Sequence, residues 1–252
     1  MNETRNRVYQ GDCLEVMAGI PDKCIDMVLC DLPYGTTKCK WDAVISLEPL
    51  WFQYKRIVKD NGAIVLFGMN PFSAKLVESN LAMYRYDWFW KKEKGSNFLF
   101  GNKMPLKVIE NIHVFYRKQP CYNPQKKLRL NGPIRGCKNG TVASAVKEHF
   151  GGRNILGGKL NSGPKWEADK LLPTTLLEFK REHKRVHPTQ KPVALLEELI
   201  KTYTNEGEIV LDNCAGSGST GVACKRIGRD YLLIEREERY VKIIEERLLT
   251  MK

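Results

Sequence analysis

The sequence lacks the features that would place it in a membrane, in an oxidising compartment or around a structural metal. No stretch of the 252 residues approaches the roughly 18 uninterrupted apolar residues of a membrane span, and the polar start MNETRNRVYQG has no apolar signal core. The eight cysteines contain no CxxC pair, and the four histidines complete no zinc spacing. We therefore expect a cytoplasmic protein with reduced cysteines, no bound metal and no membrane partner.

Internal repeats and low-complexity tracts are also missing, which excludes solenoid and fibrous architectures. Apolar residues make up 42% of the chain and charged residues 28%, as in ordinary globular proteins. The length suits one large α/β domain, or such a domain carrying one insertion.

Positive charge is concentrated in one part of the chain. Residues 117–191 hold 17 Lys and Arg against 5 Asp and Glu, so this segment carries the whole net charge of +12. A neutral scaffold with one basic segment is typical of a protein that binds a polyanion such as nucleic acid. A solvated basic surface without a partner is the alternative.

Short apolar runs alternate with helical patterns, which predicts βαβ units and a parallel sheet with helices on both faces. Seven strands are expected, near Val8 and at 25–30, 63–68, 86–91, 112–117, 208–212 and 230–235. Helices are expected at 47–59, 71–83, 192–204, 219–227 and 236–251. The strands at 86–91 and 112–117 could form an antiparallel pair at one edge of the sheet.

Between these regular parts lies a basic, glycine-rich segment with little periodicity. We expect three regions: a first half of the core at 1–117, a basic insertion at 118–185 that is a candidate target-recognition region, and a second half of the core at 186–252.

A glycine loop follows the expected strand at 208–212. Gly216, Gly218 and Gly221 fit the pattern GxGxxG between a strand and a helix, and Glu235 ends the next strand 19 residues after Gly216. Such a loop lets backbone approach a nucleotide, and the spaced acid can accept both ribose hydroxyls of an adenosine. NAD would fit this fingerprint, but Asp212 just before the glycines suits a cationic ligand better than a pyrophosphate.

A second candidate site is the turn DLPYG, which follows the buried strand at 25–30. Ligands of doubly wound sheets bind beyond the carboxyl ends of strands, so Asp31 should face the same crevice as Gly216. Pro33 stiffens the turn. Asp31 and the Leu32 carbonyl could accept both N–H hydrogens of a planar amine, while Tyr34 stacks on its ring.

Together these motifs resemble the β class of amino-directed DNA methyltransferases. In that family a DPPY motif precedes an FxGxG motif, with the target-recognition region between them. Here DLPY comes first, the basic segment follows, and HPTQKP and DNCAGSG come last. The chain departs from the family at Leu32, which replaces a proline, and at Asn213 and Cys214, which replace Pro and Phe.

The resemblance implies a circularly permuted, Rossmann-like methyltransferase fold that uses S-adenosylmethionine, with one antiparallel strand in a mixed seven-stranded sheet. It implies that the amine is held by Asp31, Leu32, Pro33 and Tyr34. It implies cofactor contacts from Asp12, Lys191, Asp212, Cys214, Gly216, Ser217, Gly218 and Glu235. Double-stranded DNA would be bound by Lys126, Lys127, Arg129, Arg135 and Lys138. A homodimer is left open.

Asp rather than Ser at position 31 resembles adenine-N6 enzymes more than cytosine-N4 enzymes. The function we expect is methyl transfer to N6 of an adenine that has been flipped out of the duplex. Three alternatives stay open: a cytosine-N4 enzyme, a non-catalytic nucleic-acid-binding module with a relic pocket, and a nicotinamide-dependent dehydrogenase. The dehydrogenase would leave DLPYG, HPTQKP and the basic segment without a role.

Overall fold

The computed structural model describes residues 5–35, 43–128, 170–182, 186 and 190–251. It divides the chain into two compact units, one of residues 1–123 and 174–252 and one of residues 124–173. The described residues of the second unit form a short antiparallel pair, β6 (Lys127–Leu128) with β7 (Lys170–Leu171).

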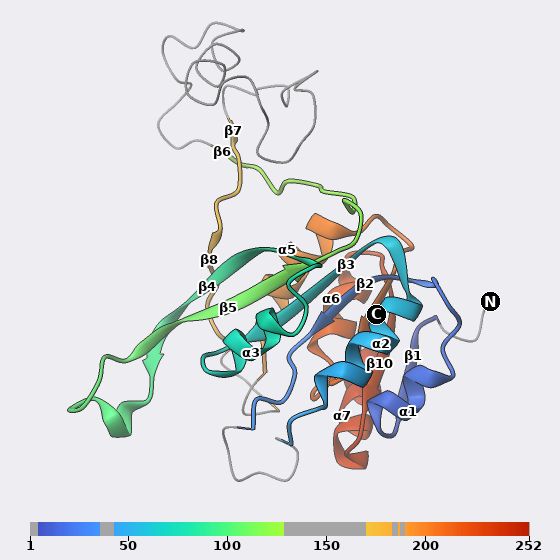
Figure 1. The fold of residues 1–252 in the computed structure, drawn as a ribbon, viewed down its shortest axis with the longest axis horizontal. Coiled ribbons are helices and arrows are strands. Elements are labelled where there is room, and N and C mark those ends of the chain that lie inside the picture. The colour runs from blue at the N-terminus through green and yellow to red at the C-terminus, as the bar shows by residue number, and fades with distance from the viewer. Residues whose placement is uncertain (1–4, 36–42, 129–169, 183–185, 187–189, 252) are drawn as a thin grey trace, which may run out of the picture. The chain divides into compact units, whose positions relative to one another are not determined.

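The first unit is built on one eight-stranded sheet in the order β1-β10-β9-β2-β3-β5-β4-β8 (Figure 1). Its strands are β1 (Arg7–Gln10), β2 (Ile25–Cys30), β3 (Val58–Gly68), β4 (Tyr84–Ser96), β5 (Lys107–Phe115), β8 (Leu176–Glu178), β9 (Ile209–Asp212) and β10 (Asp230–Glu235). Only β5 runs antiparallel to its two neighbours, as expected. The expected count of seven strands is wrong, because β8 in the basic segment adds a parallel strand outside β4.

The two ends of the chain interleave in this sheet. Strand β9 pairs in parallel with β2, and β1 pairs in parallel with β10. The late strands therefore lie beside the early ones, which is the permuted arrangement that the motif order predicts.

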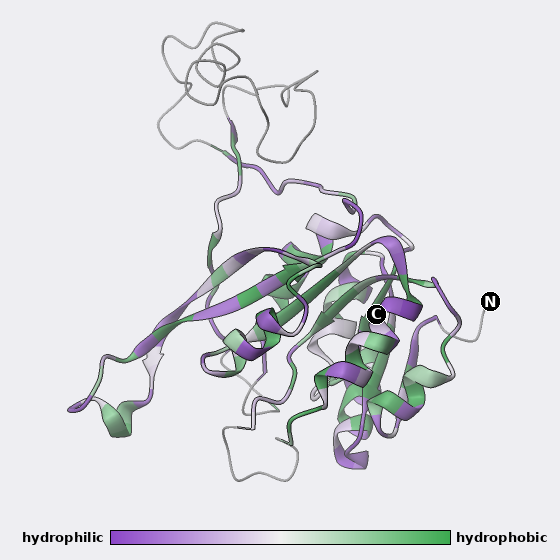
Figure 2. Ribbon diagram, in the orientation of Figure 1, coloured by the Kyte–Doolittle hydropathy of each residue, from purple (hydrophilic) through white to green (hydrophobic). Residues whose placement is uncertain are grey.

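Helices cover both faces of the sheet, as its strands require. The strands alternate apolar side chains between two cores: in β2, Met27 and Leu29 enter one core, and Val28 and Cys30 enter the other. The first core is closed by α5 (Val193–Tyr203), α6 (Ser219–Arg226) and α7 (Glu238–Leu249), and the second by α1 (Cys13–Ala18), α2 (Leu47–Ile57) and α3 (Phe72–Glu78). Figure 2 shows the central strands as the apolar part of the ribbon.

The expected helix at 71–83 is shorter in the structure, because α3 ends at Glu78 and a turn leads into β4. Strands β4 and β5 are longer than expected and form an extended hairpin (Figure 1). None of the helices in the described ranges combines the length and apolarity that crossing a bilayer requires.

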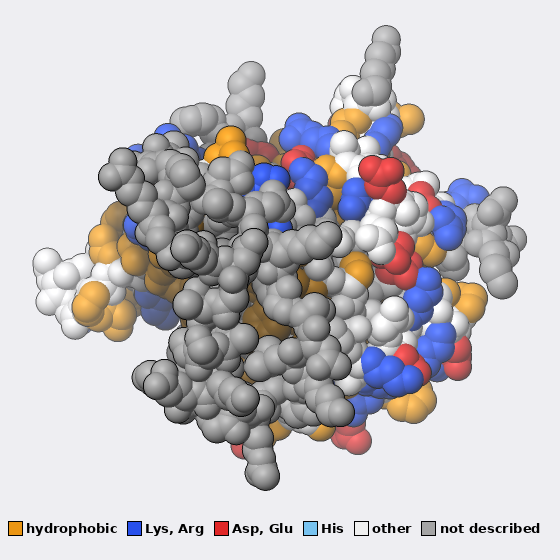
Figure 3. Space-filling model, turned by 90° about the horizontal axis from the view of Figure 1, so that it is seen from above, with side chains coloured by type: hydrophobic (Ala, Val, Ile, Leu, Met, Phe, Trp, Pro, Cys, Tyr) orange, Lys and Arg blue, Asp and Glu red, His pale blue; other side chains and the backbone are white. Residues whose placement is uncertain are grey.

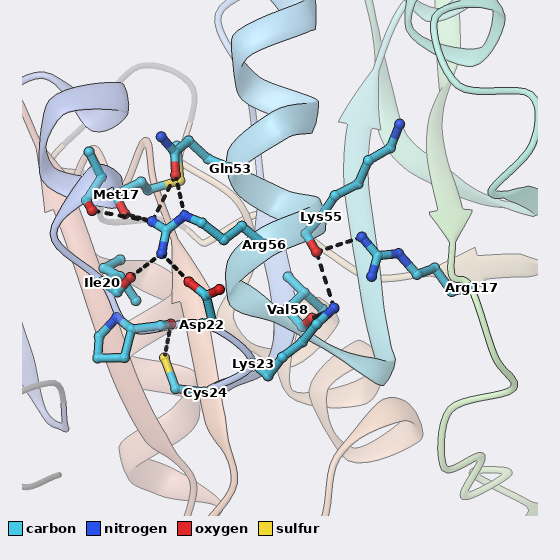
Figure 4. Close-up of polar contacts among 12 residues, drawn as sticks. Met17, Ile20, Asp22, Lys23, Cys24, Gln53, Lys55, Arg56, Val58 and Arg117 are labelled. Atoms are coloured by element: carbon cyan, nitrogen blue, oxygen red, sulfur yellow. Dashed lines mark hydrogen bonds and ion pairs between the residues drawn. The ribbon is translucent and has the colours of Figure 1, made fainter.

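Arg56 near the end of α2 fastens this helix to the end of α1 (Figure 4). Its guanidinium donates to the carbonyl oxygens of Met17 and Ile20, each at 2.6 Å, and to the Asp22 carboxylate at 2.7 Å. The Met17 carbonyl also accepts the Ile20 N–H at 3.0 Å, so Arg56 adds a second donor there and links the ends of the two helices through charge-assisted hydrogen bonds.

The turn into α6 depends on a glycine for packing. Gly218 has φ +73°, and a Cβ atom added there would lie 2.9 Å from both Cγ1 and Cγ2 of Ile244 on α7. Gly216, two residues earlier, has φ +52° but has open space at the same point. The close approach of α6 to α7 therefore depends on Gly218. Gly216 is needed only for the positive φ angle of the turn.

We predict that Gly218→Ala destabilises the protein more than Gly216→Ala does. Both substitutions place a side chain in the left-handed region, at a cost of roughly 1–2 kcal/mol. Only Gly218→Ala adds overpacking, which costs roughly 1–3 kcal/mol more. Urea denaturation of the two variants without ligand measures the difference; equal midpoints would contradict the packing role.

Candidate active site

The carboxyl ends of β1, β2, β9 and β10 surround one cavity of about 210 Å³. Parallel strands end at the same edge of a sheet, so the loops that follow them meet there. Among the residues expected to form the site, those lining the cavity are Asp12, Asp31, Leu32, Pro33, Tyr34, Lys191, Asp212, Cys214, Gly216, Ser217 and Glu235. Gly218 does not line it and packs against α7 instead.

The glycine loop and Glu235 form one side of the cavity. The Glu235 carboxylate accepts the Gly216 N–H at 2.7 Å on one oxygen and the Glu237 N–H at 2.9 Å on the other. Burial raises the pKa of Glu235, although these backbone donors oppose the rise. A carboxylate has about four acceptor sites, so with these backbone donors in place the group can still accept a hydroxyl of a ligand.

Asp212 is a buried carboxylate at the end of β9. It accepts the Cys214 N–H at 3.1 Å and the Thr220 hydroxyl at 2.6 Å. Burial raises the pKa of Asp212 to about 6. No Lys or Arg of the described ranges forms an ion pair with it, so a cationic ligand in this cavity would supply the missing counter-charge.

Asp31 forms the opposite side of the cavity, directly after β2. The Tyr34 hydroxyl donates to Oδ1 of Asp31 at 2.6 Å, and the Tyr34 ring stacks on Phe72 with centroids 5.1 Å apart. Leu32 is buried in the core, which explains how leucine is accommodated where the family has proline. The turn thus holds the Asp31 carboxylate and the Tyr34 ring against the same cavity.

Lys191 connects this turn to residues that the sequence did not reveal. Its ammonium contacts Oδ2 of Asp31 and lies 2.9 Å from Oε1 of Glu110 on β5. Lys92 on β4 lies 2.5 Å from the other Glu110 oxygen. All four of these side chains are at least three-quarters buried.

The sequence KKEK at 91–94 is typical of a solvated run of charges, but Lys92 is buried. Lys91 is exposed and pairs with Glu178 at 2.7 Å, whereas Lys92 lies beside Trp90 in the core. The period of a strand is two, so Trp88, Trp90 and Lys92 share a face. The alternation of side chains along the strand could have predicted that Lys92 is buried. No pattern in the sequence predicts the buried position of Glu110.

Four aromatic residues, Trp88, Trp90, Tyr122 and Trp166, are candidates for stacking on bases, with packing in the protein as the alternative. Trp88 and Trp90 are buried, and the Trp88 indole donates to the Tyr203 hydroxyl at 2.7 Å. Tyr122 is exposed to 43%. Trp166 lies outside the described residues.

Three cysteines, Cys13, Cys30 and Cys214, lie close together at the cavity. Burial raises the pKa of the Cys30 thiol to about 12, and a protonated thiol is a poor nucleophile. In the described ranges no group of three His, Cys, Asp or Glu side chains is arranged to hold a metal ion.

The structure describes little of the expected nucleic-acid-binding segment. Lys126 and Lys127 belong to the second unit, and Arg129, Arg135 and Lys138 lie outside the described residues. Figure 3 shows Lys and Arg side chains interspersed with Asp and Glu where described residues form the visible surface. The basic excess therefore belongs mainly to the segment at 117–191.

The chain matches known proteins along most of its length. The model of a family described as DNA methylase, N6_N4_Mtase, matches residues 25–246. The chain is 26% identical to the type II methyltransferase M.HinfI of Haemophilus influenzae, over all of this chain and 70% of that protein. It is also 26% identical to M.HpaI of Haemophilus parainfluenzae, over 96% of this chain and 74% of that protein.

Solved structures share the fold. The structure titled as an M1.HpyAVI–SAM complex matches 96% of this chain and 99% of its own, with a TM-score of 0.63 and 24% identity. The cytosine-N4-specific PvuII DNA methyltransferase matches 98% of this chain and 88% of its own, with a TM-score of 0.67 and 17% identity.

Proposed function

Because the chain belongs to the N6/N4 DNA methylase family, we propose that it transfers a methyl group from S-adenosylmethionine to N6 of adenine in double-stranded DNA. The observation that carries the proposal is the shared cavity, with the Asp31 turn on one side and the Gly216 loop with Asp212 on the other. In a nicotinamide-dependent dehydrogenase, the Asp31 turn would have no group to bind.

The lining of the cavity fits S-adenosylmethionine. This cofactor supplies an electrophilic methyl group on a sulfonium, next to an ammonium and an adenosine. Asp212 would face its positive charge, Glu235 would accept its ribose hydroxyls, and the backbone at Cys214, Gly216 and Ser217 would lie against it. Asp12, which caps α1 by accepting the Leu14 N–H at 2.8 Å, would support the same pocket.

Asp31 and the Leu32 carbonyl would act on the amine. An exocyclic amine of adenine is a poor nucleophile because its lone pair is delocalised into the ring. Two acceptors on its hydrogens localise the lone pair on nitrogen, and Asp31 compensates the positive charge that nitrogen gains. The base is out of reach in a duplex, so it must be flipped out, and Tyr34 would hold its ring.

Adenine is favoured over cytosine by Asp at position 31, since the resemblance to adenine-N6 enzymes rests on that residue. The test is the product: digest DNA methylated by the enzyme to nucleosides and identify the labelled species by mass spectrometry. N6-methyladenine is expected. N4-methylcytosine would overturn the choice of base and leave the DNA methylase assignment intact.

The segment at 118–185 is our proposed target-recognition region. Its cationic side chains, Lys126, Lys127, Arg129, Arg135 and Lys138 among them, would neutralise phosphates of the duplex. Binding through phosphates releases counterions, so the affinity for DNA should fall as salt rises.

We predict that Asp31→Ala lowers the rate of methyl transfer on the order of 10²–10⁴-fold, because the amine loses its charged acceptor. Affinity for S-adenosylmethionine should stay within several-fold, since Asp31 is assigned to the amine. Transfer of labelled methyl groups to amplified, unmethylated genomic DNA measures the rate, and calorimetry measures cofactor binding. A variant with near-normal turnover would refute the assignment.

We also predict that the affinity for S-adenosylmethionine weakens as pH falls through about 6, where Asp212 takes up a proton. The ionised form is the one that attracts a cation, so the dissociation constant should rise roughly tenfold between pH 7 and pH 5. Calorimetry across this range is the measurement. The Asp212→Asn variant should bind weakly at both pH values; an unchanged pH dependence in that variant would contradict the role of Asp212.

A further inference from the structure

Four charged side chains form a buried row beside the cavity, and the proposed chemistry uses only one of them. The row runs Lys92, Glu110, Lys191, Asp31, with the signs alternating and a net charge of zero. Glu110 and Lys92 are each about 95% buried. Burying charges costs desolvation energy that offsets their mutual attraction, so buried ion pairs often add little to stability. We therefore ask what function this row has.

The carboxylate of Asp31 already has a donor on each oxygen. Tyr34 donates to Oδ1, and the Lys191 ammonium occupies Oδ2. An incoming amine needs an oxygen of Asp31 for its own N–H hydrogen. The Lys191 cation beside it would also oppose the positive charge that the amine nitrogen gains during transfer.

Lys191 has a second acceptor within reach. Its Nζ lies 2.9 Å from Oε1 of Glu110 and 4.9 Å from the centre of the Phe67 ring. A lysine ammonium has three donors, so Lys191 can leave Asp31 and keep an ion pair. Without Glu110, the same movement would strand a buried cation, which is strongly unfavourable.

We propose that Glu110 is a positioning residue that takes over Lys191 when the amine of the target base replaces it on Asp31. The inference rests on the proposed function, since it assigns Asp31 to the amine. Glu110 is held ready by Lys92, whose ammonium lies 2.5 Å from Oε2. Burial acts to raise the pKa of Glu110, but Lys191 and Lys92 outweigh it and the pKa lies below its ordinary value, so Glu110 stays ionised.

The first test is Glu110→Gln, which keeps the size of the side chain and removes its charge. Single-turnover transfer of labelled methyl groups to amplified, unmethylated genomic DNA should slow at least tenfold. The dissociation constant for S-adenosylmethionine should stay within about threefold. A rate within threefold of the unmodified protein would overturn the inference, whereas no transfer by the unmodified protein would instead refute the proposed function.

A double variant separates positioning from structural damage. Glu110→Gln leaves Lys92 buried without a partner, so Lys92→Met together with Glu110→Gln removes both charges and should restore the thermal unfolding temperature. Lys191 still lacks its second ion-pair partner, so transfer should stay at least tenfold slow. Recovery of the normal rate in the double variant would show that only the unpaired Lys92 mattered and would overturn the inference.

Glu238→Gln is the matched control, because it makes the same change of charge in an exposed ion pair, with Lys242 at 2.7 Å on α7. It should leave the rate unchanged.

The pH profile tests whether the charge of Glu110 acts on Asp31, which the positioning role requires. The groups that face Asp31 are Lys191, Glu110, Tyr34, Asp212 and Cys30. Burial raises the pKa of Asp31, Lys191 opposes the rise, and Glu110 adds to it. Removing the charge of Glu110 should therefore lower the pKa of Asp31, so the acid limb of the rate profile should move to lower pH as the plateau falls. An unmoved limb would count against the inference.

Discussion

The parallel pairing of β9 with β2 is the interaction on which the rest of the molecule depends. Val210 and Leu211 stand opposite Met27 and Val28, so strands more than 180 residues apart in the chain share one register. Because both strands run in the same direction, Asp31 and Asp212 emerge at the same edge. If the pairing of β9 with β2 slipped by one residue, the side chains of β9 would move to the opposite face of the sheet, and Asp212 would no longer lie across the cavity from Asp31.

Asp31 and Asp212 are both buried at this edge of the sheet, and their negative charges are compensated in different ways. Asp31 is compensated inside the protein by Lys191, whose own charge is balanced by Glu110. Among the described residues, the donors to Asp212 are neutral: the Thr220 hydroxyl, the Cys214 backbone and the Cys30 thiol. On the Asp31 side of the cavity the carboxylate is paired with a cation of the protein. On the Asp212 side it is not, so a cationic ligand would be stabilised there. This asymmetry suits a site that takes a cationic cofactor on one side and a neutral base on the other.

Much of the fold was predictable because its signals are local. The strands Ile25–Cys30 and Asp230–Glu235 are confirmed at their expected bounds, since both are apolar runs bounded by turns and charges. The sequence order of the motifs also predicts which loops line the cavity. What escaped prediction depends on tertiary contacts: β8 is three residues long and forms only by pairing with β4. Glu110 was missed because an isolated acid in a strand has no pattern of its own, and its role exists only where Lys92 and Lys191 converge.

The anchoring of residues 124–173 has a consequence for how such enzymes diversify. Just before this segment, Asn123 donates to the backbone oxygens of Thr202, Lys201 and Thr204 at the end of α5. Just after it, Thr175 accepts the Phe89 N–H and leads into β8. The chain thus leaves and re-enters the first unit at two points held by hydrogen bonds, and the residues of both cores all belong to that unit. We therefore expect residues 124–173 to accept substitutions, and the exchange of whole stretches, while the first unit keeps its fold.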